Sequence, residues 1–143
     1  MGILRILLVD NGVSHVTYLG RRPLPPWVDL PGGTLADNAS PVHPKLSTIE
    51  RNDFLTYPPA LQETIAEHDA CIWALGTSSV GMSEAEYTDI TVGYFGTFLD
   101  VLKAKGVGTA ASPFRVVFVS GDRVDSTETS RVLFSRVKVR KLC

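Results

Sequence analysis

The hydrophobic residues of this chain gather in short runs separated by polar, glycine-rich or proline-rich stretches. The clearest run, Asp69–Thr77 (Asp-Ala-Cys-Ile-Trp-Ala-Leu-Gly-Thr), begins at charged residues and leads into Ser78 and Ser79. A nearly unbroken apolar run bounded by turn residues is typical of a parallel strand buried on both faces. We therefore expect this strand in the middle of a sheet, with Gly76, Thr77 and the two serines at its carboxyl end, where open α/β sheets bind ligands.

Three other stretches have the composition of strands. The β-branched and aromatic run His15–Gly20 is closed by Arg21-Arg22-Pro23, and Phe114–Val119 leads into Ser120-Gly121-Asp122. Lys45–Glu50 is a candidate short edge strand. Val, Ile, Tyr and Phe favour strands, and Gly, Pro, Asn and Asp end them.

Helical patterns lie between these strands. Pro58–Ala66 carries prolines suited to a first turn, and Ser83 followed by Glu86 forms a capping box that opens a helix to about Lys105. Within that helix, Gly93 and Gly96 suggest close packing against a neighbour. Its aromatic residues are expected in the core or at its rim: Tyr87, Tyr94, Phe95 and Phe98. A basic amphipathic helix is predicted from about Glu128 to Leu142.

Two stretches are less regular. Ile3–Val9 is apolar but too short for periodicity to separate a strand from the end of a helix. Asp10-Asn11-Gly12 ends it either way, as a hairpin turn after a strand or with Gly12 as a helix stop. Pro23–Pro44 holds most of the prolines, and we expect a surface loop there.

The alternation of strands and helices predicts an α/β fold with a mostly parallel sheet covered by helices on both faces, in a single domain over residues 1–143. Right-handed crossovers then place Arg21, Asp53, Gly76 and Ser120 along one edge of the sheet.

Composition narrows the partners. The 143 residues are 44% hydrophobic and 20% charged with a net charge of -1, which argues against a nucleic-acid or anionic-membrane surface and favours a small molecule or another protein. Two cysteines, Cys71 and Cys143, give neither a disulfide framework nor a metal-ligand spacing, so no metal is expected. We expect a cytoplasmic protein.

Some residues at this edge of the expected sheet suggest a binding or catalytic function. Arg21 and Arg22 at a strand end can hold the 2′-phosphate of NADP, or they belong to a solvated loop. Asp53 can hydrogen-bond an adenine amino group, or form an Asx turn or helix cap. A hydrolase that uses Ser120 with one of the three histidines is disfavoured, because no Gly-x-Ser-x-Gly elbow surrounds that serine.

Five segments, spread over nearly the whole chain, resemble the atypical short-chain dehydrogenases/reductases of the Tat-interacting-protein-like branch, which are NAD(P)-binding Rossmann proteins. They are Val-Thr-Tyr-Leu-Gly-Arg-Arg-Pro, Asn-Asp-Phe, Asp-Ala-Cys-Ile-Trp-Ala-Leu-Gly-Thr-Ser, Phe-Arg-Val-Val-Phe-Val-Ser-Gly and Leu-Phe-Ser-Arg-Val-Lys.

The resemblance implies a role for each matching position. Arg21 and Arg22 would face the 2′-phosphate and favour NADP as cofactor. Asp53 and Phe54 would flank the adenine, and Gly76 and Thr77 would pass under the ribose and nicotinamide. Ser120 would orient a substrate carbonyl. Lys138 would correspond to the lysine of the Tyr-x-x-x-Lys pair, whose tyrosine exchanges the proton as hydride moves to or from the nicotinamide.

The chain departs from the family in two ways. The position four residues before Lys138 is Phe134, which has no hydroxyl for proton transfer. The family's first strand and glycine-rich phosphate turn do not precede Ile3, and its C-terminal substrate-binding part does not follow Cys143. We therefore expect a partial Rossmann-like domain, truncated at both ends. Alignment on Val16–Pro23 matches Ile3–Val9 to the end of a helix, so helix is preferred there.

The missing strand would lie between the Val16 and Ala70 strands, and its loss leaves two strand edges unpaired. Either the sheet closes the gap, or Ile3–Val9 fills it as a strand, or a second copy or protein partner covers the open sheet.

Two functions follow from these observations. The first is a protein that binds the dinucleotide NAD(P) and has weak or absent oxidoreductase activity. The alternative is a degenerate, non-catalytic interaction protein that no longer binds a dinucleotide.

A Phe134→Tyr variant tests the importance of the glycine-rich turn. We expect no NADPH-dependent reduction of carbonyl substrates by this variant, because a restored hydroxyl does not replace the missing pyrophosphate site. Turnover is measured by the loss of NADPH absorbance over a panel of aldehydes and ketones. Measurable turnover in the variant would contradict this expectation.

Overall fold

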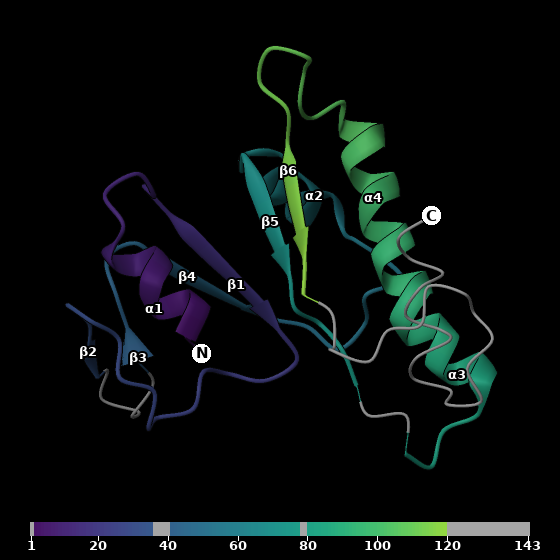
Figure 1. The fold of residues 1–143 in the computed structure, drawn as a ribbon, viewed down its shortest axis with the longest axis horizontal. Coiled ribbons are helices and arrows are strands. Elements are labelled where there is room, and N and C mark those ends of the chain that lie inside the picture. Colours follow the sequence, from purple (N-terminus) through teal and green to yellow (C-terminus); the bar gives the residue numbers. More distant parts are fainter. Residues whose placement is uncertain (1, 36–40, 78–79, 120–143) are drawn as a thin grey trace. The chain divides into compact units, whose positions relative to one another are not determined.

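The chain divides into two compact units, Met1–Asn52 and Asp53–Cys143. The computed structural model describes residues 2–35, 41–77 and 80–119 (Figure 1). The fold is α/β, with small parallel sheets and helices. Each unit is described below by itself, and the single domain over residues 1–143 remains a prediction.

Within residues 2–35 and 41–52, the first unit forms one helix and four strands. These are α1 (Gly2–Val9), β1 (Val16–Gly20), β2 (Thr34–Leu35), β3 (Pro41–Val42) and β4 (Leu46–Glu50). Strands β1 and β4 are parallel, with a register that runs from Val16 opposite Leu46 to Gly20 opposite Glu50. Strands β2 and β3 form a two-residue antiparallel pair. The strands expected over His15–Gly20 and Lys45–Glu50 are confirmed.

The ambiguous run Ile3–Val9 is helical, as part of α1. Leu8 is its buried residue, so one side of the helix faces the core. The chain leaves the helix through an Asx turn, because the Gly12 N–H donates to the Asp10 carboxylate at 2.7 Å. The side chain of Asp10, rather than a left-handed glycine, therefore stops the helix.

The core of the first unit corrects the expectation for Pro23–Pro44. Four residues form its buried centre: Leu8, Leu24, Val28 and Leu30. Three of these come from the segment that we expected to be a surface loop. Apolar residues scattered among prolines show neither helical nor strand periodicity, but the segment folds under the β1–β4 sheet and buries them. A sheet of only two strands needs such a cover on one face to be stable.

The described residues of the second unit, 53–77 and 80–119, form three α-helical segments, one π-helical turn and two strands. These are α2 (Pro59–Ala66), β5 (Ala70–Trp73), α3 (Glu84–Thr88), η1 (Asp89–Gly93), α4 (Tyr94–Lys105) and β6 (Arg115–Phe118). Strands β5 and β6 are parallel, from Ala70 opposite Arg115 to Trp73 opposite Phe118. Helix α2 packs against α4, and Glu63 forms an ion pair with Lys105 between them (Figure 1).

Aromatic rings hold α4 against the sheet of the second unit. The Trp73 ring lies 5.2 Å from those of both Phe95 and Phe98, measured between centroids. The Phe118 ring on the neighbouring strand is 5.3 Å from Phe95. Tyr87 and Phe98 are buried, which confirms the expected place of these residues in the core. Edge-to-face and tilted ring pairs stabilise a core beyond the area that they bury.

The expectation of a strand buried on both faces is wrong for β5. Its residues alternate: Trp73 is 5% exposed, whereas Ala70 is exposed and Ile72 is 36% exposed. Among the described strands β5 pairs with β6 alone, so it does not lie in mid-sheet there. A strand is buried on both faces only where helices cover both. In the second unit α4 covers the Trp73 face.

The predicted helix from Ser83 to Lys105 is confirmed as one helical run with a π-helical turn in its middle. Gly106, at φ 61°, ends it in the left-handed conformation. The reason proposed for the two internal glycines is not supported: a Cβ at Gly93 would meet only Leu55 at 3.6 Å, and one at Gly96 would meet nothing within 4 Å. Gly93 instead closes the π-helical turn η1.

The parallel strands described here form two separate two-stranded sheets, β1 with β4 and β5 with β6, and β2 pairs antiparallel with β3. Two of the three ways to fill the gap are therefore not seen in this part of the chain. No strand pairing joins β1 to β5, and Ile3–Val9 is a helix instead of a strand. Cover by a second copy or a partner stays a prediction.

A Leu24→Ala variant tests whether the proline-rich segment carries the core of the first unit. We expect a loss of unfolding free energy of roughly 2–5 kcal/mol, the usual effect of removing a buried leucine. The matched control, Leu35→Ala, removes an exposed leucine of the same segment and should change stability by about 0.5 kcal/mol or less. Urea unfolding measures both. Equal changes in the free energy of unfolding for the two variants would show that the segment is a surface loop.

The capping box predicts a pH dependence. The Ser83 hydroxyl and the Ser83 backbone N–H both donate to Glu86, at 2.7 and 2.9 Å, and these bonds lower the pKa of its carboxyl below the usual 4.5. A carboxyl whose folded pKa is depressed stabilises the fold above its unfolded pKa, and this stabilisation is lost as the pH falls through the folded value.

We therefore expect a Glu86→Gln variant to melt at a lower temperature than the wild type at pH 7, and the difference to shrink as the pH is lowered below about 4. Glu84→Gln serves as the control, because Glu84 lies in the same first turn but outside the capping box. A pH-independent difference would show that the carboxylate charge at Glu86 does not matter.

Candidate functional site

The carboxyl ends of β1 and β4 bring basic residues together. Gly20 lies opposite Glu50, and the Arg51 N–H donates to the Gly20 carbonyl at 2.8 Å, so the parallel ladder continues one step past the strand ends. Arg21 therefore follows β1 beside the point where Arg51 follows β4. With the exposed Arg22, three arginines therefore follow the carboxyl ends of the two paired strands in the chain. We call Arg21, Arg22 and Arg51 the arginine edge.

Arg51 was not singled out in the sequence. A lone arginine after a candidate edge strand has no distinctive pattern, and only the register of β1 against β4 places it beside the Arg21-Arg22 pair. Arg51 is half-buried, and both it and Arg21 already take part in interactions within the structure. The signal that would have found it is parallel pairing, since the ends of neighbouring parallel strands share one edge.

Tyr18 shapes the backbone of the arginine edge. Its hydroxyl donates to the Arg22 carbonyl at 3.4 Å. The ring folds over Gly20, where a Cβ would collide with it. A glycine at this position therefore allows the tyrosine to lie across the strand end and hold the turn that carries both arginines.

Asp53 and Phe54, at the start of the second unit, stabilise a turn and the core. The Asp53 carboxylate accepts hydrogen bonds from the Leu55 N–H, at 2.8 Å, and from the Thr56 hydroxyl. This is the Asx turn that the sequence left as an alternative to adenine binding. The Phe54 side chain is 2% exposed and stacks at a tilt on Tyr94 with centroids 5.6 Å apart. Its ring therefore belongs to the core.

Gly76 and Thr77 lie beyond the carboxyl end of β5. Gly76 is exposed, and a Cβ there would meet nothing within 4 Å, whereas Thr77 is half-buried. The Val119 N–H donates to the Trp73 carbonyl at 2.9 Å, so the chain leaves β6 at the same edge. Ser120, Phe134 and Lys138 lie outside the described residues, as do Ser78 and Ser79.

The predicted site residues thus fall into two groups. In the first unit, Arg21 and Arg22 follow β1 beside the position where Arg51 follows β4. Asp53 with Phe54, and Gly76 with Thr77, belong to the second unit and are described there. Ser120, the end of the next strand, follows the last described residue, Val119.

The described histidines and cysteine have local roles. His15 contacts the Ser47 hydroxyl at 3.1 Å, His43 accepts from the Lys45 N–H at 3.0 Å, and His68 bonds to the Thr64 carbonyl at 2.7 Å. Burial raises the pKa of the Cys71 thiol to about 11, so it is protonated and a poor nucleophile at neutral pH. No group of three or more His, Cys, Asp or Glu suited to a metal occurs among the described residues.

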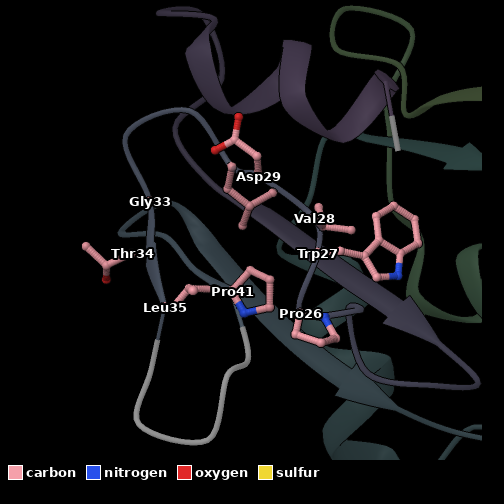
Figure 2. A pocket seen from close by; sticks show the side chains of 9 residues that line it. Pro26, Trp27, Val28, Asp29, Gly33, Thr34, Leu35 and Pro41 are labelled. Atoms are coloured by element: carbon pink, nitrogen blue, oxygen red, sulfur yellow. The ribbon is translucent and has the colours of Figure 1, made fainter.

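A shallow hollow of about 210 Å³ lies elsewhere in the first unit (Figure 2). Pro26, Trp27 and Pro41 are among its lining residues, and Trp27 is 76% exposed. Its carboxylate, Asp29, pairs with Arg5 at 3.2 Å. The figure shows the Asp29 carboxylate directed toward α1 and the Trp27 ring turned away from Pro41. The hollow therefore offers a ligand both polar and apolar contact.

Two further findings concern membrane spans and similarity to known proteins. None of the helices within residues 2–35, 41–77 and 80–119 has the length and apolarity that a membrane crossing needs. The chain matches no model of a known protein family and no curated protein sequence.

Proposed function

We propose that this protein binds NADP through the arginine edge and is related to the atypical short-chain dehydrogenases/reductases, with weak or absent oxidoreductase activity. The single observation that carries the proposal is the grouping of Arg21, Arg22 and Arg51 at the carboxyl ends of two paired parallel strands. In the Rossmann-like fold that the proposal assumes, this is the edge where the adenosine end of a dinucleotide binds.

The chemistry of the arginine edge suits a phosphate monoester. A guanidinium donates two parallel N–H bonds to phosphate oxygens and stays charged at every physiological pH. Two exposed arginines in sequence, Arg21 and Arg22, can approach one phosphate from two sides. Such an edge favours NADP over NAD, since only NADP carries the 2′-phosphate.

The candidate residues of the second unit would contribute less to dinucleotide binding than the resemblance implies. Asp53 would have to bind an adenine amino group in addition to the local hydrogen bonds that both of its carboxylate oxygens already accept. Phe54 would contribute only backbone, because its ring is in the core. Gly76 lets a ligand approach closely because its surroundings are open. Thr77 would pass beside the ribose and nicotinamide.

Catalysis by this site would be weak. The resemblance gives Ser120 the role of orienting a substrate carbonyl, and Lys138 that of lowering the pKa of a tyrosine hydroxyl and holding the ribose. Phe134 stands where that tyrosine would be, so the proton that must accompany hydride transfer has no donor at this position. We therefore propose dinucleotide binding as the main property and turnover as a minor one.

A non-catalytic interaction protein remains the second candidate. One specific observation favours it: the face of the β5–β6 sheet opposite Trp73 presents apolar side chains, with Ile72, Val117 and Val119 all exposed. Contiguous exposed apolar patches are a feature of surfaces that contact other proteins. This function needs neither a phosphate turn nor a catalytic tyrosine.

Titration with NADPH and with NADH tests the proposal. We expect NADPH to raise the melting temperature more than NADH does, because bound ligand stabilises the folded state in proportion to its affinity. In an Arg21→Ala/Arg22→Ala variant the NADPH effect should fall to the NADH level, with affinity weakened roughly tenfold or more by the loss of charge-assisted hydrogen bonds.

A Lys103→Ala/Arg115→Ala variant is the matched control, since it removes the same charge from an α-helix and strand outside the arginine edge. It should keep the NADPH preference. An unchanged melting temperature in a wild-type protein that melts cooperatively would overturn dinucleotide binding and favour the interaction protein.

A further inference from the structure

Trp27, in the first unit, holds its ring out to solvent. The side chain is 76% exposed, although tryptophan in folded proteins is buried over most of its surface. The second tryptophan of the chain, Trp73, is 5% exposed and follows that rule. Figure 2 shows the Trp27 ring pointing away from Thr34 and Leu35, which line the same hollow. The ring therefore contributes little to the core and is accessible to a ligand.

The backbone beneath the Trp27 ring is held in place. The Val28 N–H donates to the Pro25 carbonyl at 2.9 Å, which closes a turn with Pro26 and Trp27 at its two central positions. Proline at the first central position presets the φ angle of such a turn. Val28, directly after the turn, is buried in the core of the first unit. A fixed turn, and not a loose loop, thus exposes the ring.

The same core supports the arginine edge. Trp27 follows Arg22 by five residues, so their Cα atoms lie at most roughly 18 Å apart, and the turn before Val28 shortens this distance. The Tyr18 hydroxyl donates to the Arg22 carbonyl at 3.4 Å, and Tyr18 packs against the core cluster that contains Leu24 and Val28. The turn with the two arginines and the turn with Trp27 are therefore anchored on one core within one unit.

The chemistry of the proposed ligand requires a surface for its base. The 2′-phosphate of NADP is carried by the ribose that also bears the adenine, so a single sugar joins phosphate and base. The resemblance implies Asp53 and Phe54 for the adenine, but the Phe54 ring is in the core and the Asp53 carboxylate already holds a turn. A purine presents two flat π faces, and tryptophan is a large aromatic surface on which such a base stacks.

We propose that the Trp27 ring stacks on the adenine of the nucleotide whose 2′-phosphate the arginine edge binds. This inference rests on the NADP binding proposed above and deepens it, because it assigns the base and the phosphate of one nucleoside to residues of the first unit. The ligand class is a purine nucleoside that carries a phosphate on its ribose.

Two probes test the base and the phosphate separately. Adenosine 2′,5′-bisphosphate carries both, and ribose 5-phosphate carries a phosphate without a base. Affinities are measured by the change in melting temperature with ligand concentration. Trp27→Ala should weaken the affinity for the bisphosphate roughly fivefold or more, the usual loss when a stacked aromatic residue is replaced by alanine. It should leave the affinity for ribose 5-phosphate unchanged.

Conservative variants separate stacking from apolar contact. Trp27→Phe keeps a flat ring and should retain most of the affinity for the bisphosphate, whereas Trp27→Leu keeps an apolar side chain without a ring and should bind like Trp27→Ala. The matched control is Leu35→Ala, which removes an exposed apolar side chain from the same hollow. This control should change neither affinity.

Tryptophan fluorescence supplies a direct readout. Trp27 and Trp73 are the two tryptophans of the chain, and the exposed one should lose emission intensity when adenine stacks on it. The Trp27→Phe protein, which keeps the buried Trp73, should show no such quenching even though it still binds the bisphosphate. Quenching of equal size in this variant would contradict a stack on Trp27.

The outcomes distinguish this inference from the proposed function. If Arg21→Ala/Arg22→Ala abolishes bisphosphate binding and Trp27→Ala does not change it, the stacked adenine is wrong and NADP binding stands. A wild-type protein that binds neither NADPH nor the bisphosphate overturns both. Equal weakening of the two probes by Trp27→Ala would give the ring a structural role only. A Trp27→Ala variant that changes the molecular mass in solution and keeps its affinity for the bisphosphate would assign the ring to a protein interface instead.

Discussion

The main structural constraint in each unit is the parallel pairing of two short strands, β1 with β4 and β5 with β6. A two-stranded sheet is marginally stable in water, and it persists only when one face is packed against something apolar. In the first unit that cover is the proline-rich segment with Leu24, Val28 and Leu30. In the second it is α4, fixed to Trp73 and Phe118 by Phe95 and Phe98.

Parallel pairing also creates the candidate site. Because parallel strands point the same way, the residues that follow them emerge at one edge, and the side chains of two distant sequence segments meet there. The pairing of Gly20 with Glu50 is what turns two adjacent arginines into the three-residue arginine edge. Antiparallel pairing would have sent Arg51 to the opposite end of the sheet.

The same small sheets leave apolar surfaces exposed. The Ile72 and Val117 side chains stand exposed on the face of the second sheet away from Trp73. This exposure has a physical cause: a parallel sheet is stable when helices lie on both of its faces, and the described part of this unit places α4 on one.

The sequence by itself determined most of the elements. Proline at a helix start, the Ser83–Glu86 capping box and the β-branched strand runs are local signals, and their energies depend on neighbours a few residues away. They located α2, the helical run to Lys105, β1, β4 and β6. The family resemblance, which matched Ile3–Val9 to the end of a helix, also predicted the helical structure of this run correctly.

Only the tertiary structure decided burial, register and partnership. An apolar run such as Ala-Cys-Ile-Trp does not say whether one face or two will be covered, because that depends on which helices pack nearby. The core residues of the proline-rich segment and the place of Arg51 depend on contacts with residues from other elements, for which no local pattern exists. The local sequence at Asp53 allowed either an Asx turn or a ligand contact. In the structure the Asp53 carboxylate accepts hydrogen bonds from Leu55 and Thr56, and these bonds form the turn.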